Sequence, residues 1–454
     1  MSDMLTLRGC ELPKTPSVTA TVRKELRVVP YSPVQTLAPA SFDVFVETDD
    51  AYVVPHFWGV QTAESLGIPL TDERPPGAPA PALVFQGALR PAQRPIVEAT
   101  LANLEKVGGS VVCAPTGHGK TAMALYMAAR CGVKTMVLVH KAFLAQQWVD
   151  RARQFVPTAT CTMYGGGTWD CSGDVVVATI QTVLRRGVPD AVAGAVGLLI
   201  IDEVHRIAAP SFSKATLGLN ARRIIGLSAT PDRADRLTRV LHWVCGPLVA
   251  AAPPTTIEHD VTVVRATFRK ERAIPQNARG DVDHATLITQ LAEDDERTAF
   301  IVGEMIKHVP TTTPCLVLSH RRAHCHLLAE CLRQQGYDAK TYLGGDASAP
   351  DACVLVATYS LVSEGFDRPE LTALVLATPA STITQAVGRI LRRPGPKTIV
   401  DVVDTNPVSY AQANKRRAFY ASAGYLGGRG ADSWYGKPRG PQWTPVEPER
   451  VYMF

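Results

Sequence analysis

Residues 110–130, SVVCAPTGHGKTAMALYMAAR, join a short apolar run to a helical pattern through a loop that contains two glycines and a lysine. Within it, APTGHGKT has the spacing of a phosphate-binding loop, with Ala114 where the general pattern has its first glycine. Glycines there let backbone N–H groups turn toward phosphate oxygens at a helix N-terminus. The loop therefore predicts a bound nucleotide, and its specified residues are Thr116, Gly117, Gly119, Lys120 and Thr121.

Hydrolysis of that nucleotide needs several chemical groups. Lys120 can reach the β- and γ-phosphates, and the Thr121 hydroxyl can ligate Mg²⁺. The metal also needs a carboxylate, and the attacking water needs a base or an orienting group. The stretch LLIIDEVHR supplies both, because an apolar strand delivers Asp202 and Glu203 to its carboxyl end, where α/β sheets bind ligands. We expect Asp202 to hold Mg²⁺ and Glu203 to act as the base.

The elements that position these residues form two series of apolar strands alternating with helical stretches. They indicate an α/β protein with two parallel sheets wrapped by helices. The first series is SVVCAP, TMVLVH, DVVVAT, LLIIDE and RIIGLSAT; the second is CLVLSH, DAKTYL, CVLVAT, ALVLAT and TIVDVV. We predict sheet domains at 83–250 and 263–425, a linker at 251–262, a small β-containing module at 1–82 and an irregular Gly- and Pro-rich tail at 426–454.

Composition narrows the class of protein. The chain of 454 residues is too long for one core, and 46% apolar with 20% charged residues is ordinary for globular proteins. A net charge of +5 permits a polyanionic partner without requiring one. Ten cysteines without a C-x-x-C pair favour thiols in a reducing compartment. Neither a signal peptide nor a membrane span is evident, so we expect a soluble intracellular protein with no membrane partner.

Three further stretches carry residue types that need an interpretation of their own. HRRAHCHLLAEC carries His320, His324, Cys325, His326 and Cys331, but the spacing fits no familiar zinc pattern and we favour an ordinary helix face. KRRAFYASAGY at 415–425 is interpreted as a basic closing helix with a solvated face. The tail is interpreted as a surface strap, with base stacking or phosphate binding as the alternative for Arg429, Trp434, Lys437, Arg439 and Trp443.

The phosphate loop and the DEVH box together resemble those of the superfamily 2 helicases of the DEAH/DExH branch, and further motifs follow in the family's order over roughly residues 87 to 404. The resemblance implies two tandem RecA-like domains. It implies that Arg90 and Gln93 of LRPAQ read adenine, and that VLVHKAFLAQQW and VVATIQTV contact the nucleic-acid backbone. Coupling of hydrolysis to domain movement is implied for His205, Ser228 and Thr230.

The second series carries the remaining motifs. ATYSLVSEGFD resembles the motif that faces the nucleic acid and the domain cleft, through Thr358, Glu364, Gly365 and Asp367. QAVGRILRR fits Q-x-x-G-R-x-x-R and gives Gln385, Gly388, Arg389 and Arg392. The two arginines would stabilise the phosphoryl transition state, so the resemblance predicts a site completed when the domains close on ATP.

Two positions depart from the family's pattern. Val204 replaces the alanine of the DEAH and DEAD boxes, a small apolar change that leaves Asp202 and Glu203 in place. VLVHKAFLAQQW is a loose match, whose Lys141 and Gln147 fit an amphipathic helix equally well.

The segments KELRVVPY and VVPHFWGV, taken with the motifs, resemble helicases of large nucleocytoplasmic DNA viruses of the poxvirus transcript-release type. Eukaryotic transcription-and-repair DNA translocases and phage recombination helicases are close to that group. The resemblance implies an enzyme that uses ATP and Mg²⁺ to move along DNA 3′ to 5′, in viral transcription termination, recombination or repair. The transcription machinery would be a candidate partner, and the place of action the host cytoplasm or nucleus, or the virion.

Three alternatives stay open on the sequence. The enzyme could translocate on duplex DNA without separating strands, because the motifs report ATP use and backbone grip only. It could be an RNA helicase with a similar core. It could also be a nucleic-acid-binding scaffold that has lost hydrolysis, although the intact Lys120, Asp202, Glu203, Arg389 and Arg392 argue against that.

Overall fold

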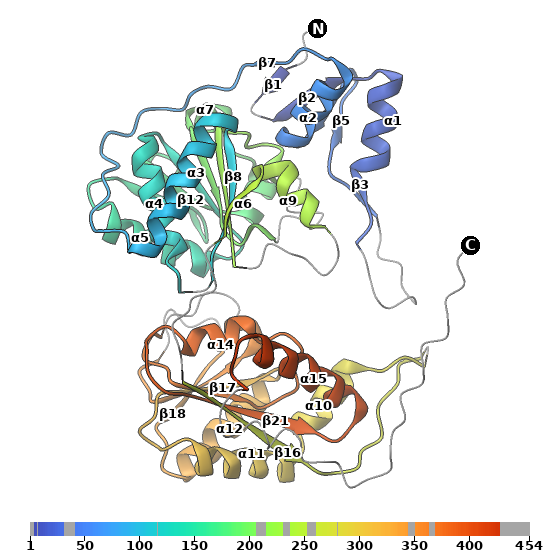
Figure 1. The fold of residues 1–454 in the computed structure, drawn as a ribbon, viewed down its shortest axis with the longest axis vertical. Helices are drawn as coiled ribbons and strands as arrows, with labels where there is room; N and C mark the ends of the chain where they lie inside the picture. Colours follow the sequence, from blue (N-terminus) through green and yellow to red (C-terminus); the bar gives the residue numbers. More distant parts are fainter. Residues whose placement is uncertain are drawn as a thin grey trace. The chain divides into compact units, whose positions relative to one another are not determined.

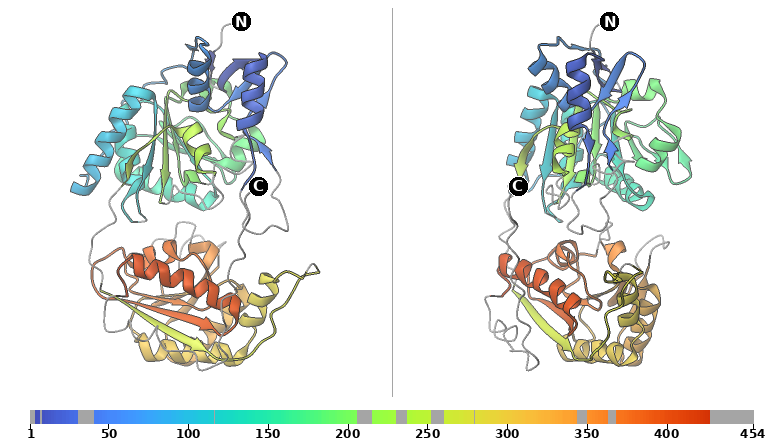
Figure 2. Two further views of the ribbon diagram at one scale, coloured as in Figure 1. Left: turned by 45° about the vertical axis from the view of Figure 1, so that its right-hand side comes forward. Right: turned by 90° about the vertical axis from the view of Figure 1, so that its right-hand side faces the viewer.

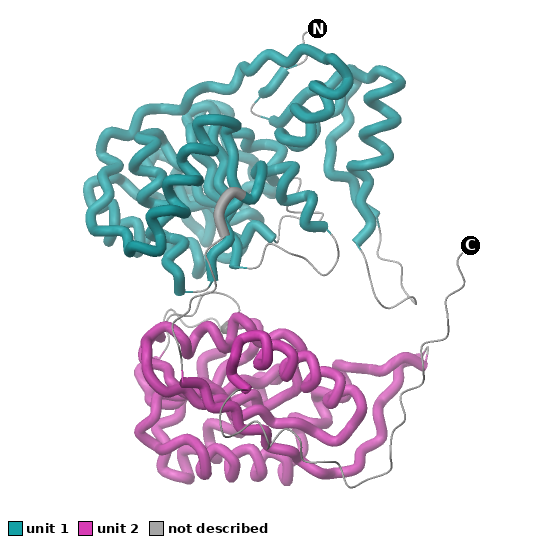
Figure 3. The backbone as a smooth tube through the Cα atoms, viewed as in Figure 1, with its two compact units in different colours: residues 1–257 teal, residues 258–454 magenta. Residues whose placement is uncertain are grey.

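The computed structural model describes residues 4–6, 8–30, 41–115, 117–205, 215–229, 237–251, 260–278, 280–343, 350–362 and 368–426. The chain divides into two compact units, residues 1–257 and 258–454, each with its own parallel sheet (Figure 1, Figure 3). The predicted fold class, two tandem α/β domains with a β-containing module at the amino terminus, is confirmed. In the described part of the chain, no helix is long and apolar enough to cross a membrane.

The first unit is built on a sheet with the strand order β11-β10-β12-β9-β13-β14-β8-β15, parallel throughout except for β11. Its strands are β8 (Gly109–Cys113), β9 (Thr135–Val139), β10 (Cys161–Gly165), β11 (Thr168–Trp169), β12 (Val175–Thr179), β13 (Leu198–Ile201), β14 (Arg223–Ser228) and β15 (Leu248–Ala251). Its helices are η1 (Pro91–Gln93), α3 (Arg94–Val107), α4 (Lys120–Cys131), α5 (Ala142–Phe155), α6 (Ile180–Arg186), α7 (Asp190–Ala195) and α9 (Thr238–Cys245). The five predicted strands are all present. The sequence analysis did not predict β10, β11 or β15.

Both faces of this sheet are buried, which is why its strands are continuously apolar. Successive side chains of a strand point to opposite faces. Val112 and Ile200 therefore pack with α3, α4 and α5, while Val111 and Ile201 pack with α6, α7 and α9. Figure 2 shows the helices and the sheet from two further sides. Because the strands are parallel, their carboxyl ends lie at one edge of the sheet, and the loops that follow them meet there.

Residues 1–82 belong to the first unit and do not form a unit of their own. Their sheet has the order β5-β6-β2-β1-β7, in which β7 is parallel to β1 and the other neighbours are antiparallel. The strands are β1 (Met4–Thr6), β2 (Gly9–Pro13), β5 (Val46–Glu47), β6 (Ala51–Val54) and β7 (Thr71–Asp72), with a separate hairpin of β3 (Arg27–Val28) and β4 (Phe42–Asp43). The helices are α1 (Pro16–Glu25) and α2 (His56–Leu66).

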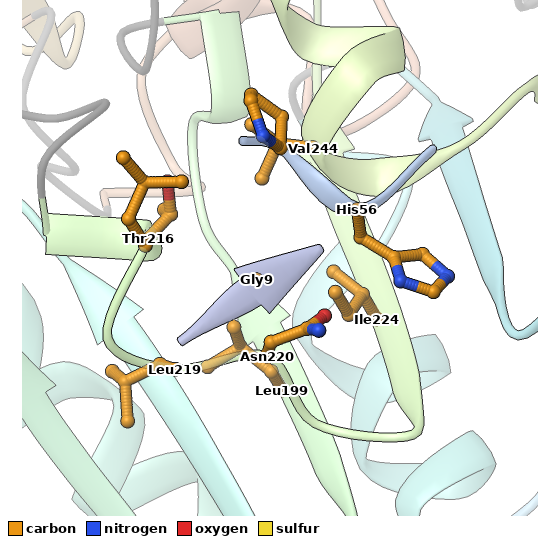
Figure 4. A pocket seen from close by; sticks show the side chains of 10 residues that line it. Gly9, His56, Leu199, Thr216, Leu219, Asn220, Ile224 and Val244 are labelled. Atoms are coloured by element: carbon orange, nitrogen blue, oxygen red, sulfur yellow. The ribbon is translucent and has the colours of Figure 1, made fainter. Parts of the chain in front are cut away.

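This module contacts the first sheet at the edge where the strands begin, opposite the edge where they end. Arg74 Nη1 donates to the Ala221 carbonyl at 3.0 Å, and Asn220 Nδ2 donates to the Thr6 carbonyl at 2.8 Å. A small cavity beside these contacts is lined by His56 and Asn220 among others (Figure 4). Burial and the positive charge of Arg74 lower the pKa of His56 to about 3, so this imidazole is neutral at physiological pH.

The second unit contains a fully parallel sheet with the order β16-β21-β20-β17-β19-β18. Its strands are β16 (Val261–Phe268), β17 (Cys315–Ser319), β18 (Ala339–Tyr342), β19 (Val354–Thr358), β20 (Ala373–Leu376) and β21 (Lys397–Asp404). Its helices are α10 (His284–Ala292), α11 (Asp295–His308), α12 (Arg322–Gln334), α13 (Tyr359–Val362), α14 (Thr384–Ile390) and α15 (Pro407–Ser422). Helices α11 and α12 cover one face of the sheet, and α13, α14 and α15 cover the other.

The predicted linker and the predicted tail are described only in part. Strand β16, which the sequence analysis did not predict, begins at Val261, inside the range predicted to be a linker. Residues 252–259 of that range lie outside the described residues, as do residues 427–454 with the tail's arginines, lysine and tryptophans.

The prediction of a solvated basic face at 415–425 is wrong for Arg416, which is buried on α15. Its guanidinium is paired with Asp401 of β21 at 2.7 Å, and Tyr420 donates to the same carboxylate at 3.1 Å. The sequence showed a cluster of cations but not the carboxylate, which is buried in the strand that the helix covers.

Candidate active site

The phosphate loop connects the end of β8 to α4, whose first two residues are Lys120 and Thr121. Gly117 and Gly119 have φ angles of 83° and 85°, which residues with a Cβ rarely adopt. At Gly119 the space is closed as well, because a Cβ would lie 2.5 Å from the Gln93 amide nitrogen. Within the described residues no side chain caps α4 here, so the first N–H groups of the helix can bind an anion.

Lys120 lies along the inside of this loop. Its Nζ donates a hydrogen bond to the Ala114 carbonyl oxygen at 2.9 Å. An ammonium group has three donors, so Lys120 can bind phosphate oxygens without breaking this bond. Thr116, which the sequence assigns to the same loop, lies outside the described residues.

The two acidic residues lie where β13 ends, at the same edge of the sheet. Asp202 N–H donates to the Leu138 carbonyl of the neighbouring strand at 3.0 Å, and Glu203 then turns the chain with a φ of 49°. A left-handed φ in a residue with a Cβ costs on the order of 1 kcal/mol or more. The Asp202 side chain supports the turn, because its Oδ1 accepts the Glu203 N–H at 2.9 Å. The turn fixes the direction of both carboxylates.

Trp148 is a part of the site that the sequence analysis missed. It lies on α5 with only 3% of its surface exposed, and its Nε1 donates to Asp202 Oδ2 at 2.8 Å. The stretch around it, VLVHKAFLAQQW, predicted a contact with nucleic acid or an amphipathic helix. Because the two partners are 54 residues apart in the chain, no local pattern links them.

The ionisation of Asp202 is set by its surroundings. Burial and the negative charge of Glu203 raise the pKa of Asp202 to about 6, while the Trp148 hydrogen bond and the positive charge of Lys120 act in the opposite direction. The Asp202 carboxyl group therefore takes up a proton at a higher pH than an ordinary aspartate does. The electrostatic influence of Lys120 on Asp202 links the phosphate loop to the acidic turn.

His205 and Ser228, both predicted to couple hydrolysis to movement, lie next to each other. His205 Nδ1 is 3.1 Å from Ser228 Oγ at the end of β14, and 3.3 Å from Glu203 Oε2. The histidine therefore connects the acidic turn to the strand that precedes the predicted Thr230. Thr230 itself lies outside the described residues.

Arg90 and Gln93 hold the phosphate loop. Gln93 Nε2 donates to the His118 carbonyl at 2.7 Å, and Gln93 Oε1 accepts the Arg90 N–H at 2.8 Å. The Arg90 guanidinium donates to the carbonyls of Gly117, at 3.2 Å, and of His118. Burial and the charges of Arg90 and Lys120 lower the pKa of His118. Arg90 and Gln93 therefore support the phosphate loop by donating hydrogen bonds to its carbonyl groups. That these two residues bind adenine stays a prediction.

The two stretches expected to contact a nucleic-acid backbone meet at the carboxyl edge of the sheet. Gln181 Nε2 of α6 donates at 2.8 Å to the carbonyl of His140, which follows β9. Thr179 begins α6 as its N-cap, with its side chain accepting the Thr182 N–H. Lys141 occupies the N-cap position of α5, although its side chain does not cap the helix.

In the second unit the predicted residues lie on and around α14 and β19. Gln385 and Arg389 are on α14, with Arg389 6% exposed, and Arg392 follows the helix. Thr358 ends β19, and its Oγ1 is 3.1 Å from Ser360 Oγ. The predicted Glu364, Gly365 and Asp367 lie outside the described residues.

The histidines of α12 lie in different surroundings. His324 is buried between Ser319 Oγ, 2.9 Å from its Nδ1, and Thr298 Oγ1, 3.3 Å from its Nε2, whereas His326 is exposed. Across the residues described by the structure, no group of three or more His, Cys, Asp or Glu side chains could hold a metal ion.

The chain is similar to a protein family and to several known proteins. Residues 86–233 match the family model described as type III restriction enzyme, res subunit, and that range contains both the phosphate loop and the acidic turn. The chain is 26% identical over 423 residues to the "Putative ATP-dependent RNA helicase L396" of Acanthamoeba polyphaga mimivirus, covering 88% of this chain and 80% of the relative. It is 29% identical over 344 residues to the "Putative helicase 055L" of Frog virus 3 (isolate Goorha). That alignment covers 74% of this chain and 78% of the relative. Among solved structures, the chain is similar to the crystal structure of T4 UvsW at 16% sequence identity and a TM-score of 0.39. The alignment covers 93% of this chain and 97% of the T4 UvsW chain.

The matched family domain and the helicase relatives support an ATP-dependent helicase, and the phosphate loop and the acidic turn lie within that domain. The predicted resemblance to helicases is confirmed, since both named viral relatives are described as putative helicases.

Proposed function

We propose that this protein is an ATP-driven motor that moves along DNA in the 3′ to 5′ sense. The observation that carries the proposal is the arrangement at one edge of the first sheet. There the loop with Lys120 and the acidic turn of Asp202 lie at the same edge as the stretches around His140 and Thr179, which the sequence assigns to the nucleic-acid backbone.

The residues present fit ATP with Mg²⁺. Asp202 and Thr121 offer oxygen ligands, which Mg²⁺ prefers, and Lys120 offers a cation for the phosphates. When bound, Mg²⁺ would neutralise charge on the phosphates. Glu203 is positioned by the turn that Asp202 supports, and we assign it the role of accepting the proton of the attacking water.

Movement requires that hydrolysis changes the grip on the strand. We assign this link in the first unit to His205 and Ser228, whose contact joins the acidic turn to the end of β14. In the second unit we assign transition-state stabilisation to Arg389 and Arg392, a further catalytic role to Gln385, which is on α14 with Arg389, and backbone contact to Thr358. The remaining assignments, to Glu364, Gly365 and Asp367, rest on the sequence pattern alone.

The substrate and pathway rest on the resemblance to DNA-virus helicases and phage recombination helicases. On that basis we propose DNA, and a role in viral transcription termination, recombination or repair in the host cytoplasm or nucleus, or in the virion, with the transcription machinery as a candidate partner. An RNA helicase is the second candidate, because the mimivirus relative is named for RNA. Translocation on duplex DNA without strand separation is the third.

The test is the steady-state rate of ATP hydrolysis without polymer and with single-stranded DNA, duplex DNA or RNA, each at low and high salt. Stimulation by DNA that weakens with salt is the expected result, because phosphate contacts release counterions. Preferential stimulation by RNA would move the enzyme to the RNA helicases. No stimulation by any polymer, with hydrolysis intact, would contradict a nucleic-acid motor.

A further inference from the structure

The hairpin of β10 and β11, whose β11 is an outermost strand of the first sheet, carries an exposed tryptophan. Trp169 has 49% of its surface exposed, although it is the residue of β11 that pairs with Tyr164. The turn between the strands is Gly166–Gly167, and both of these glycines, like Gly165 at the end of β10, have a positive φ. The hairpin lies at the end of the sheet's strand order, and it was not predicted from the sequence.

The ring of Trp169 is held in place. The Arg186 guanidinium, at the end of α6, lies 3.8 Å from the centre of the ring, and Tyr164 meets it edge-on at a centroid distance of 6.1 Å and 81°. Tyr164 is itself fixed, because its hydroxyl donates to the Gly187 carbonyl at 3.0 Å. An indole fixed in this way loses little side-chain entropy when a further flat group stacks on it.

The hairpin lies among the segments predicted to grip nucleic acid. Tyr164 is in register with Ala178 on β12, so Trp169 is level with the carboxyl end of that strand. A Cβ on Gly165 would lie 2.7 Å from Thr179 Oγ1, and one on Gly166 would lie 3.4 Å from Ala142 Cβ. The end of β10 and the turn therefore lie close to the starts of α6 and α5 respectively.

The chemistry of this surface is that of a nucleic-acid contact. Arg185 and Arg186 are both exposed at the end of α6, close to an exposed aromatic ring. Proteins that bind single strands combine cations for the phosphates with aromatic rings on which bases stack, and the stacking accepts any base. A protein partner would more often be met by a contiguous apolar patch, whereas here cations adjoin a single ring.

We propose that Trp169 is a stacking platform for one unpaired base, with Arg186 fixing the ring and both arginines neutralising the adjacent phosphates. This inference rests on the proposed function and makes it more specific, since it names a single-stranded region as the substrate class. In a closed duplex both faces of every base are already stacked. Trp169 therefore acts on a single strand or on the separated arm of a fork, in DNA or RNA.

The experiment uses the full chain and oligothymidylate carrying one 2-aminopurine at successive positions, in DNA and in RNA. Stacking quenches 2-aminopurine fluorescence, so the parent should show a quench centred on one position. Trp169→Ala should abolish the quench and weaken single-strand affinity about 5- to 100-fold, with Trp169→Phe between the two. An abasic site at the quenched position should weaken the parent and leave Trp169→Ala unchanged.

Arg186→Ala should also weaken single-strand binding and reduce the quench. Its matched control is Arg130→Ala, which removes one exposed cation from the last turn of α4, at the opposite edge of the same sheet. Parent and Trp169→Ala binding with equal affinity and equal quench would overturn the platform while leaving the motor intact. If the parent binds neither single strand but duplex DNA stimulates its ATP hydrolysis, the platform fails and translocation on duplex DNA remains. If it binds no polymer at all, the proposed function fails as well. Quenching in RNA alone would keep the platform and reassign the polymer.

Discussion

At the residue scale, the bond between Trp148 and Asp202 is the feature of the site with the clearest chemical consequence. A hydrogen bond to a charged group contributes about 1.5–3 kcal/mol, more than one between neutral groups. This bond favours the ionised carboxylate against the burial that raises its pKa to about 6. We therefore assign Trp148 a positioning role, acting through Asp202.

Trp148→Phe should raise the Mg²⁺ concentration for half-maximal ATP hydrolysis about tenfold, because Asp202 loses a donor that holds its charge and direction. At low Mg²⁺ the rate should fall as the pH falls through the pKa of Asp202. Since loss of the donor raises that pKa, the acid limb should move to higher pH. Both quantities come from Mg²⁺ and pH titrations of the hydrolysis rate.

The matched control is Trp58→Phe, which removes an indole hydrogen bond of 2.9 Å to the Glu25 carboxylate in the amino-terminal module. That variant should keep the Mg²⁺ dependence of the parent. An unchanged Mg²⁺ requirement and pH profile in Trp148→Phe would show that the bond is only structural.

At the scale of elements, buried charges fasten the helices of the second unit to its sheet. β21 presents Asp401 to Arg416 of α15 and Asp404 to Arg297 of α11, which cover opposite faces. Removing one member of such a pair leaves a buried charge alone and costs about 3–5 kcal/mol. Uncharged polar residues are buried as well, and His324 of α12 is enclosed by Ser319 and Thr298.

Burial and the positive charge of Arg297 lower the pKa of His324 to about 3. An unfolded chain has an ordinary histidine pKa near 6.5, so below that pH only the unfolded state takes up the proton, and stability is lost as the pH falls. Between pH 7.5 and 5.5, His324→Gln should lose about 1.4 kcal/mol less free energy of unfolding than the parent. Denaturant unfolding followed by circular dichroism at both pH values measures this.

His326→Gln is the control on the same helix, because solvent reaches that side chain in the folded protein as well. It should keep the pH dependence of the parent. Identical losses in His324→Gln and the parent would mean that another group takes up the proton.

At the scale of the whole molecule, the chain distributes its assigned chemistry over two compact units. Lys120, Asp202 and Glu203 belong to residues 1–257, whereas Arg389 and Arg392 belong to residues 258–454. The proposed motor needs side chains from both units for one reaction, so ATP binding and hydrolysis should be separable by substitution.

Arg389→Ala should keep ATP binding and lose hydrolysis by about 10³-fold or more, as expected for a cation at a phosphoryl transition state. Lys120→Ala should also abolish hydrolysis, by removing the cation of the phosphate loop. Arg393→Ala, which removes an exposed cation four residues along, is the control and should hydrolyse ATP like the parent. Hydrolysis rates with single-stranded DNA and titration with a fluorescent ATP analogue give the two quantities. Comparable hydrolysis by Arg389→Ala and the parent would exclude the assigned role.

Strands and motifs were predictable because their causes are local. Buried parallel strands must be continuously apolar, so β8 could be predicted from its own residues. A phosphate loop needs glycines with left-handed φ angles next to a helix start, so Gly117, Gly119 and Lys120 could be predicted from the residues around them. The strands β10 and the short β11 carry weaker patterns. β10 forms because β12 offers it an open edge, and β11 then pairs with β10.

The sequence by itself determined two α/β domains, a phosphate loop and an acidic turn at the end of a strand. Only the tertiary structure decided that Trp148 bonds Asp202, that Gln93 supports the phosphate loop, that Arg416 is buried and that Arg186 holds Trp169. The physical reason is that side chains distant in sequence become neighbours only when helices and strands pack. The sequence therefore predicted a residue's chemical type, and packing selected its partner.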